Sequence, residues 1–325
     1  MTVLLVRVVY TAFIFLLFSA TTGRATVVLH VDQAGNGDYR RIQDAIDAVP
    51  ANNSKHVLIV IKPGVYQERV VVPSNKPFVT LSGTSKRHKT IITWNAFGDI
   101  FSSPTVTIFA SDFIGRYLTI LNTHGAGAKA VALRVSGDKA SFYWCRIQSH
   151  QDTLLDEKGR HYYRNCYIEG DTDFICGNAA SVFKKCHLHS LSQGNGAVTA
   201  QQRQSPEEQT GFIFVGGKVS GSSNSAVLGR PWGTYSRVVF AFTYMSSVIN
   251  PEGWDDWGNS SRQTTAFYGE YKCKGAGASS SNRVNWSHSL TSDEAEPYLS
   301  WGAIGGQSWV RSAIARLRKI SSKIS

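Results

Sequence analysis

Apolar residues in the N-terminal part of the chain predict one helix, followed by a series of short strands. Between residues 39 and 50, apolar side chains recur at i, i+3, i+4 and i+7, which predicts one short helix that ends at Pro50. These side chains are Ile42, Ala45, Ile46 and Val49. Beyond Pro50, short β-rich runs are separated by Gly, Pro, Asn or Ser. They predict strands over Val57–Ile61, Arg69–Val72, Phe78–Leu81, Thr90–Thr93 and Thr105–Ile108.

A repeated motif in the middle of the chain sets the spacing of the strands. In each copy an aromatic or apolar pair precedes a cysteine, and an apolar residue lies two positions past it. The cysteines are Cys145, Cys166 and Cys186, spaced 21 and 20 residues apart. Few hairpin-turn signals join neighbouring strands. The near-constant period therefore predicts an all-β, single-domain parallel β-helix with a short N-terminal helix, in which equivalent residues of successive coils stack.

Polar residues follow the same period. Asp152 and Asp173 are 21 residues apart, and Lys129 lies 22 residues before Gln151. We therefore expect these four residues to form one column on one face of the coil stack. Turn chemistry alone can explain a single Asp, but two carboxylates at coil spacing beside Gln and Lys favour a catalytic site. Two carboxyl groups held close together have different pKa values, because both cannot easily be charged at once. One can then be a protonated acid while the other is an ionised nucleophile.

Composition and charge narrow the class of partner. Of the 325 residues, 42% are hydrophobic, so the chain can bury a large core and is not expected to be disordered. The formal net charge of +11 attracts polyanions. Without a nucleic-acid-binding motif, an acidic polysaccharide and a merely solvated basic surface both stay open. The Cys and His residues lack the spacing of metal ligands, so we expect no metal and no cofactor.

The N-terminus has the order of a secretory signal peptide. Arg7 precedes an apolar run over residues 8–18, and small and polar residues follow. The run is short for a bilayer, although a signal anchor is the alternative. We expect a signal peptide at residues 1–24, a secreted chain and no membrane span. Secretion makes three sequons candidate N-glycosylation sites, at Asn52, Asn259 and Asn285.

Several short segments occur in the order found in one enzyme family. They are Gly64–Glu68, Ala130–Arg134, Gln151–Leu154, Asp173–Ile175, Gly177–Ala179, Leu228–Trp232, Tyr268–Tyr271 and Gly275–Ala278. Through this ordered set the chain resembles plant-type pectin methylesterases over about residues 27–310, in the form without an inhibitor-like pro-region. The resemblance implies a right-handed parallel β-helix that hydrolyses methyl esters of homogalacturonan to pectate and methanol.

The resemblance also implies a domain organisation and a setting. A catalytic domain over residues 25–310 is followed by a basic C-terminal tail over 311–325. The enzyme is expected as a monomer in the plant cell wall, where it acts on methyl-esterified pectin. A proteinaceous pectinesterase inhibitor is an expected partner, whereas nucleic acid and membranes are not.

The resemblance implies a role for each residue of the site. Asp173 attacks the ester carbonyl, and Asp152 protonates the departing methanol and then activates water. Gln151 donates a hydrogen bond to the oxyanion. Arg230 holds Asp173 ionised through a bidentate contact and contacts substrate, and Trp232 stacks on a sugar ring.

The sequence departs from the family pattern near these residues. Lys129 stands where the family usually has a glutamine, and we count it as substrate-binding. It could support the oxyanion, or it could lower the pKa of Asp152 and disable the acid. Leu155 and Cys176 replace a tyrosine and a phenylalanine that are common in the family.

The cysteine ladder predicts a covalent link between two coils. Cys166 and Cys186 hold equivalent positions on successive coils, and relatives that resemble this chain have a disulfide at this spacing. The alternative is a stack of three free thiols that includes Cys145.

Two other functions stay open. A pectate lyase or polygalacturonase could use the same scaffold, although neither the calcium-binding carboxylates nor the clustered acids of those enzymes are visible. A non-catalytic pectin-binding wall protein is the other alternative, favoured by the basic charge and by Lys129.

Overall fold

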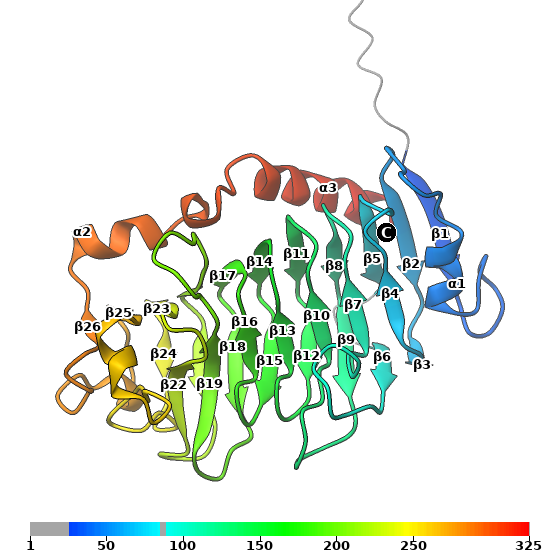
Figure 1. Ribbon diagram of the computed structural model, residues 1–325. Coiled ribbons are helices and arrows are strands. Elements are labelled where there is room, and N and C mark those ends of the chain that lie inside the picture. The colour runs from blue at the N-terminus through cyan, green and yellow to red at the C-terminus, as the bar shows by residue number, and fades with distance from the viewer. Residues whose placement is uncertain (1–25, 85–88, 325) are drawn as a thin grey trace, which may run out of the picture.

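Three parallel sheets form the walls of one long coil in the computed structural model, which describes residues 26–84 and 89–324 (Figure 1). Each complete turn of the coil contributes one strand to each sheet, and the turns at the ends of the stack contribute to fewer sheets. This is the right-handed parallel β-helix that the sequence predicts. The predicted signal peptide, residues 1–24, lies outside the described residues.

The sheets contain strands from successive coils in order. Sheet A has eleven strands: β1 (Val27–Val31), β2 (Val57–Ile61), β5 (Val79–Gly83), β8 (Ile114–Arg116), β11 (Ala140–Tyr143), β14 (Arg160–Arg164), β17 (Ala180–Lys184), β20 (Gly211–Val215), β23 (Arg237–Ala241), β25 (Phe267–Tyr271) and β26 (His288–Ser289). Sheet B has eight: β3 (Gly64–Gln67), β6 (Thr90–Trp94), β9 (Leu118–Asn122), β12 (Arg146–Gln148), β15 (Tyr167–Gly170), β18 (His187–Ser190), β21 (Lys218–Ser220) and β24 (Tyr244–Met245). Sheet C has seven: β4 (Val70–Val72), β7 (Val106–Ile108), β10 (Leu133–Val135), β13 (Leu154–Asp156), β16 (Ile175–Gly177), β19 (Gly196–Gln201) and β22 (Ala226–Pro231).

Helices lie at the ends and along one side of the coil stack. They are α1 (Ile42–Asp47), α2 (Ser292–Ala295) and α3 (Trp309–Ile324), with short 3₁₀ turns over Ser260–Thr264, Ala276–Ala278, Glu296–Tyr298 and Trp301–Ile304. In Figure 1, α1 lies at the end of the stack where the chain starts, and α3 runs along its upper side.

A column of aromatic rings fills the interior behind sheet A. Parallel pairing places the rings of successive coils at the same height. Neighbouring ring centroids are 5.1, 4.6, 4.6 and 4.3 Å apart and the rings lie within 16° of parallel, in the order Phe142, Tyr163, Phe183, Phe214 and Phe240. Each such pair adds about 0.5–1.5 kcal/mol beyond the buried area. The aromatic position of the sequence repeat is therefore the core of the fold.

The predicted helix is shorter than its apolar stripe suggests. The expected span was 39–50, but Tyr39 pairs with Val31 in a β-bridge, so the chain is still extended there. The helix begins at Ile42 because the buried carboxylate of Glu68 accepts the backbone N–H groups of Ile42 and Gln43, at 2.9 and 3.0 Å. A carboxylate at this place satisfies donors that the first turn leaves unpaired.

The segment expected as a basic tail is a packed helix in the structure. Helix α3 covers residues 309–324, and its buried residues include Trp309, Val310, Ala313, Leu317 and Ile320. They pack against the outer face of sheet A, on side chains such as Tyr143 and Tyr162. The apolar residues recur at helical spacing between exposed basic ones, which is the pattern of an amphipathic helix. The positive charge of the segment had suggested a tail instead.

The three repeat cysteines lie in a column as free thiols. Cys166 donates to the carbonyl of Phe142 at 3.5 Å, and Cys186 donates to that of Tyr163 at 3.7 Å. All five cysteines of the chain are unbonded in the structure. The expected Cys166–Cys186 disulfide is thus not formed here, and the pairing stays a prediction.

The aromatic column should carry a measurable share of the stability. Phe183→Ala removes the central ring and leaves a cavity between Tyr163 and Phe214, so we expect a loss of about 3–5 kcal/mol in the free energy of unfolding. The exposed Phe97→Ala is the control and should change it by less than about 0.5 kcal/mol. Equilibrium urea unfolding measures both. Similar small effects of the two variants would contradict a structural role for the column.

Candidate active site

The two aspartates occupy equivalent turns between sheets B and C. Asp152 lies between β12 and β13, and Asp173 lies one coil later, between β15 and β16. Both residues have left-handed backbones, with φ of 60° and 49°, a conformation that Asp tolerates better than most residues. The backbone N–H of Asp152 donates to the carbonyl of Thr172 at 3.1 Å, which ties the two turns together.

Lys129 and Gln151 belong to the same face. They pair in a parallel β-bridge, one coil apart. The structure therefore brings Lys129, Gln151, Asp152 and Asp173 together in successive turns, at the positions that the coil spacing predicts. Lys129 is exposed and Gln151 is half-buried, whereas both aspartates are buried.

Burial and mutual repulsion separate the protonation states of the carboxyl groups. Asp152 is 6% exposed and Asp173 is 5% exposed. Burial first, and then the charge of Asp173, raise the pKa of Asp152 to about 7. Burial also raises the pKa of Asp173, but its hydrogen bonds to Arg230 and the Arg230 charge oppose the rise directly. Near neutral pH the arrangement therefore favours a proton on Asp152 and a carboxylate at Asp173.

Arg230 makes a planar, two-point contact with Asp173. Its Nε and a terminal nitrogen donate to the two carboxylate oxygens, each at 2.7 Å. The strand register runs from Cys176 to Ala200 to Arg230, so the guanidinium reaches back toward Asp173 past the small side chain of Ala200. This fork fixes the orientation of the carboxylate as well as its charge.

The positive charge of Lys129 does not prevent Asp152 from holding a proton. Lys129 and Arg230 both lower the pKa of Asp152, yet burial and Asp173 outweigh them and the value stays at about 7. Lys129 also lowers the pKa of Asp173. The lysine thus favours the ionised form of the pair without removing the candidate acid.

A small apolar floor lies beside the carboxylates on the outer face of sheet C. It consists of Val131, Leu155, Cys176 and Ala200, with Ile100 and Trp232 packed against it. Burial, followed by the charges of Asp152 and Asp173, raises the pKa of Cys176. Its thiol therefore stays protonated and is no competing nucleophile. The predicted sugar-binding Trp232 is partly exposed next to this floor.

Aromatic residues that the sequence analysis did not assign flank the site. The ring of Trp257 lies 4.0 Å from the guanidinium carbon of Arg230 and is 37% exposed. On the other side, exposed Phe101 lies 4.7 Å from the guanidinium carbon of Arg134. Trp257 lies in a loop outside the coil repeat, so its place beside Arg230 has no signal in the periodicity.

A third carboxylate near the pair is held inside the coil. Asp156 accepts hydrogen bonds from Tyr163 and Ser181, and His161 Nδ1 lies 2.6 Å from its Oδ1. All four residues are buried. The side chain of Asp156 is therefore occupied by structural contacts, which leaves Asp152 and Asp173 as the candidate reactive pair.

Other predicted features have plain structural settings. Asn52, Asn259 and Asn285 are all exposed, so a glycan could be attached to each. Within residues 26–84 and 89–324, there is no group of three or more His, Cys, Asp or Glu residues that could hold a metal ion. No helix in this part of the chain is both long and apolar enough to cross a bilayer.

Comparison with known proteins places this chain in one family. A model of the pectinesterase family matches residues 27–307. The chain belongs to the pectinesterase family. It is 54% identical to putative pectinesterase 11 of Arabidopsis thaliana over 88% of this chain and 82% of that protein.

Solved structures of pectin methylesterases share the fold of this family member. Pectin methylesterase from carrot is 36% identical, with a TM-score of 0.84 over 91% of this chain and 98% of that chain. A pectin methylesterase solved in complex with a hexasaccharide is 28% identical, with a TM-score of 0.75 over 86% of this chain and 97% of that chain. The resemblance inferred from the motifs and the right-handed parallel β-helix are both confirmed.

The raised pKa of Asp152 should make stability depend on pH. An unfolded Asp titrates near pH 4, whereas Asp152 in the folded pectinesterase titrates near 7. Protonation thus stabilises the fold below about pH 4, and this contribution is lost as the pH rises through about 7. Asp152→Asn removes the penalty, so its stability relative to wild type should grow between pH 4 and 8, by up to about 4 kcal/mol. Urea unfolding at several pH values measures this difference, and a difference that does not change with pH would contradict the assignment.

Proposed function

We propose that this pectinesterase hydrolyses methyl esters of homogalacturonan to pectate and methanol, with Asp173 as nucleophile and Asp152 as acid and base. The observation that carries the proposal is the two-point contact of Arg230 with the carboxylate of Asp173, next to Asp152, whose pKa is raised to about 7. One group is ready to attack and the other is ready to give a proton.

In the first step a carboxylate oxygen of Asp173 attacks the ester carbonyl carbon. The oxyanion that forms accepts a hydrogen bond from the side chain of Gln151, and such a donor contributes about 3–4 kcal/mol in comparable sites. Asp152 gives its proton to the departing methoxide, which leaves as methanol. The acyl group of the sugar then remains joined to Asp173 as an anhydride.

In the second step the pair exchanges roles with water. Asp152, now ionised, takes a proton from a water molecule as the water attacks the acyl carbon. The bond to Asp173 breaks, the sugar leaves as a free carboxylic acid that loses its proton to solvent, and Arg230 receives the regenerated carboxylate of Asp173. Asp152 is protonated again, and no cofactor is needed for either step.

Aromatic residues around the pair suit a sugar polymer. Trp232 and Trp257 offer partly exposed rings on one side of the carboxylates, and Phe101 offers one on the other. Stacking on sugar rings would align several units of methyl-esterified pectin across the site. A related pectin methylesterase has been solved in complex with a hexasaccharide, which supports the binding of a sugar polymer.

The expected setting is the plant cell wall, reached by secretion as a glycosylated monomer. The order of residues in the N-terminal 24 supports secretion, and the exposure of Asn52, Asn259 and Asn285 is compatible with glycosylation. A proteinaceous inhibitor that covers the Asp152–Asp173 pair is an expected partner. The basic charge of the chain suits an acidic wall polysaccharide.

Replacement of the nucleophile should abolish the reaction. Asp173→Asn keeps the size of the side chain but removes the charge, so methanol release from highly methyl-esterified pectin should fall by at least about a thousandfold. Asp171→Asn, two residues away in the same turn, is the matched control and should keep near-normal release. Methanol is measured directly, and circular dichroism checks the fold. Wild-type turnover by Asp173→Asn would overturn the mechanism. Pectin binding by wild type without methanol release would instead favour a non-catalytic binding protein.

The role of Lys129 can be tested by whether its substitution lowers or raises methanol release. If its ammonium stabilises the oxyanion, Lys129→Ala should lower methanol release by about tenfold, whereas Lys129→Gln should keep most of it. If it disables Asp152, both substitutions should raise release, because the acid regains its proton. We expect the first result, since the pKa of Asp152 stays at about 7 in the presence of Lys129. Equal rates for all three proteins would show that the lysine side chain does not act in the reaction.

A further inference from the structure

A cavity of about 400 Å³ lies on the outer side of sheet A, away from the catalytic face on sheet C. Strands β14 and β17 form one wall, and the segment from Leu299 to Gln307 forms the other. The residues that give it chemical character are Tyr162, Arg164, Lys184, Lys185 and Trp301. It therefore combines three cations with two aromatic rings.

The cations of this cavity are gathered without a counter-charge. Arg164 and Lys184 face each other across β14 and β17, where parallel strands are about 4.8 Å apart. Lys185 follows directly. Like charges at opposed positions destabilise a sheet. None of the three forms an ion pair with a described acidic residue.

Two further observations indicate that the cluster is incompletely satisfied. The Nε of Arg164 is buried and has no hydrogen-bond partner among the described residues. Burial, and then the charges of Lys185 and Arg164, lower the pKa of Lys184. A buried donor and a crowded ammonium are both costly, and an anion bound between them would offset both costs.

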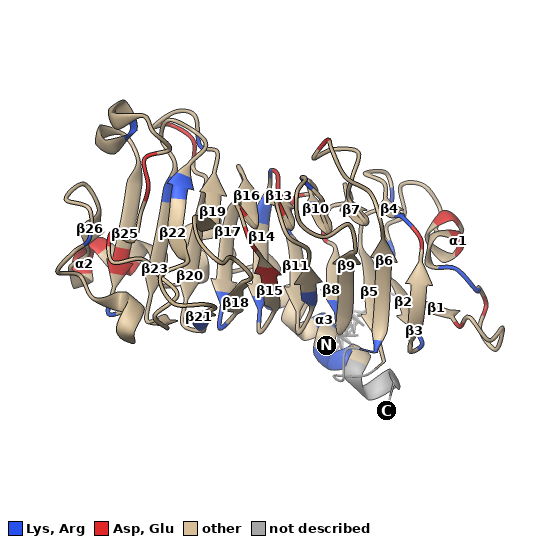
Figure 2. Cartoon of the chain, turned by 90° about the horizontal axis from the view of Figure 1, so that it is seen from below, with Lys and Arg blue, Asp and Glu red and all other residues tan. Residues whose placement is uncertain are grey.

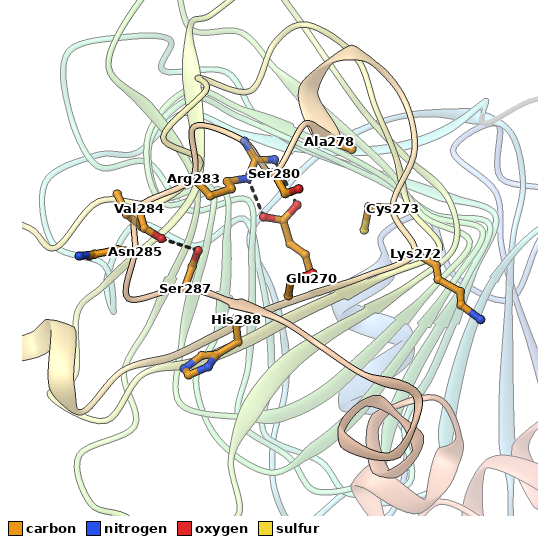
Figure 3. Close-up of a pocket in the computed structure, with 11 residues that line it drawn as sticks. Glu270, Lys272, Cys273, Ala278, Ser280, Arg283, Val284, Asn285, Ser287 and His288 are labelled. Carbon is orange, nitrogen blue, oxygen red and sulfur yellow. Dashed lines mark hydrogen bonds and ion pairs between the residues drawn. The ribbon is translucent and has the colours of Figure 1, made fainter.

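A second cavity, of about 350 Å³, shows what a satisfied cation looks like in the same fold (Figure 3). There Arg283 donates to both carboxylate oxygens of Glu270, at 2.7 and 3.1 Å. It also donates to the carbonyls of Asn250, Pro251 and Gly277. The charge and the donors of Arg283 are therefore bound within the protein, and this arginine is not available to a ligand.

We infer that the cavity formed by Arg164, Lys184, Lys185 and Trp301 binds a carboxylate of an acidic oligosaccharide, namely a de-esterified uronate unit. Arg164 and the lysines hold the carboxylate, and the partly exposed ring of Trp301 contacts the sugar face. The inference rests on the proposed function, because that reaction produces such carboxylates. Basic positions lie near β15, β18 and β21 along one edge of the coil stack (Figure 2), and those just before β15 and β18 are Arg164, Lys184 and Lys185 of the cavity itself.

The place of the cavity makes it a subsite for product. The same coils that carry Asp152 and Asp173 carry Arg164 and Lys184, but on a different sheet. A uronate in the cavity therefore leaves the catalytic carboxylates free. The enzyme would be retained on pectate that it has already de-esterified while the active site processes another stretch of polymer.

The test compares two oligogalacturonates of equal length, one de-esterified and one fully methyl-esterified. Binding is measured by calorimetry in the Asp173→Asn background, so that the esters persist. In that background, Lys184→Gln/Lys185→Gln removes two charges from the cavity. Lys55→Gln/Lys62→Gln removes the same charge from exposed positions elsewhere and is the matched control.

We expect Lys184→Gln/Lys185→Gln to weaken binding of the de-esterified oligomer by about tenfold, the effect of losing roughly 1.4 kcal/mol of interaction. Binding of the fully esterified oligomer should not change. Lys184→Arg/Lys185→Arg should retain binding, and Trp301→Ala should weaken it. Equal weakening by the control pair would show an effect of net charge alone and would overturn the inference, as would unchanged binding in the cavity variant.

Methanol release separates this inference from the proposed function. With Asp173 intact, Lys184→Gln/Lys185→Gln should release methanol from esterified oligomer at the wild-type rate, which also shows that the variant folds. Normal release with unchanged uronate binding would overturn the cavity alone. Absence of release by wild type would overturn the proposed function instead.

Discussion

Hydrogen bonding between parallel strands of successive coils is the constraint on which the rest of the structure depends. It places residues that are one coil apart in the sequence at neighbouring positions in space. The same register stacks the ring of Phe183 between Tyr163 and Phe214 in the interior and sets the turn of Asp152 beside that of Asp173 on the surface. Core packing and the pairing of the two aspartates are thus two results of one repeat.

The two stacked aspartates differ in protonation because their surroundings differ. Asp173 receives the Arg230 fork, whereas Asp152 is buried beside a negative charge and has a pKa of about 7. Two identical side chains can then act as nucleophile and acid. Asp156, a third carboxylate in the same region, instead accepts hydrogen bonds from Tyr163 and Ser181. On sheet A, Arg164 and Lys184 repeat the pattern with positive charge, and neither forms an ion pair with a described acidic residue.

The sequence predicted those parts of the structure that repeat. The spacing of the cysteines and aromatic residues predicted the coil, and the coil spacing predicted the column from Lys129 to Asp173. Contacts between residues that do not follow this spacing could not be predicted from it. The Arg230–Asp173 pair spans 57 residues and was expected only from the family resemblance. The start of α1 depends on Glu68, 26 residues beyond Ile42, and α3 was hidden by its basic residues.

The most direct test of the account is the pH dependence of kcat/KM for methanol release. In the free enzyme this ratio reports the ionisations of the essential acid and base. A protonated Asp152 beside an ionised Asp173 predicts a bell-shaped profile whose alkaline limb falls near pH 7, the pKa of Asp152. In Lys129→Gln that limb should move to higher pH, because the lysine lowers this pKa. A wild-type profile without an alkaline limb up to pH 9 would contradict the assignment of Asp152 as the acid.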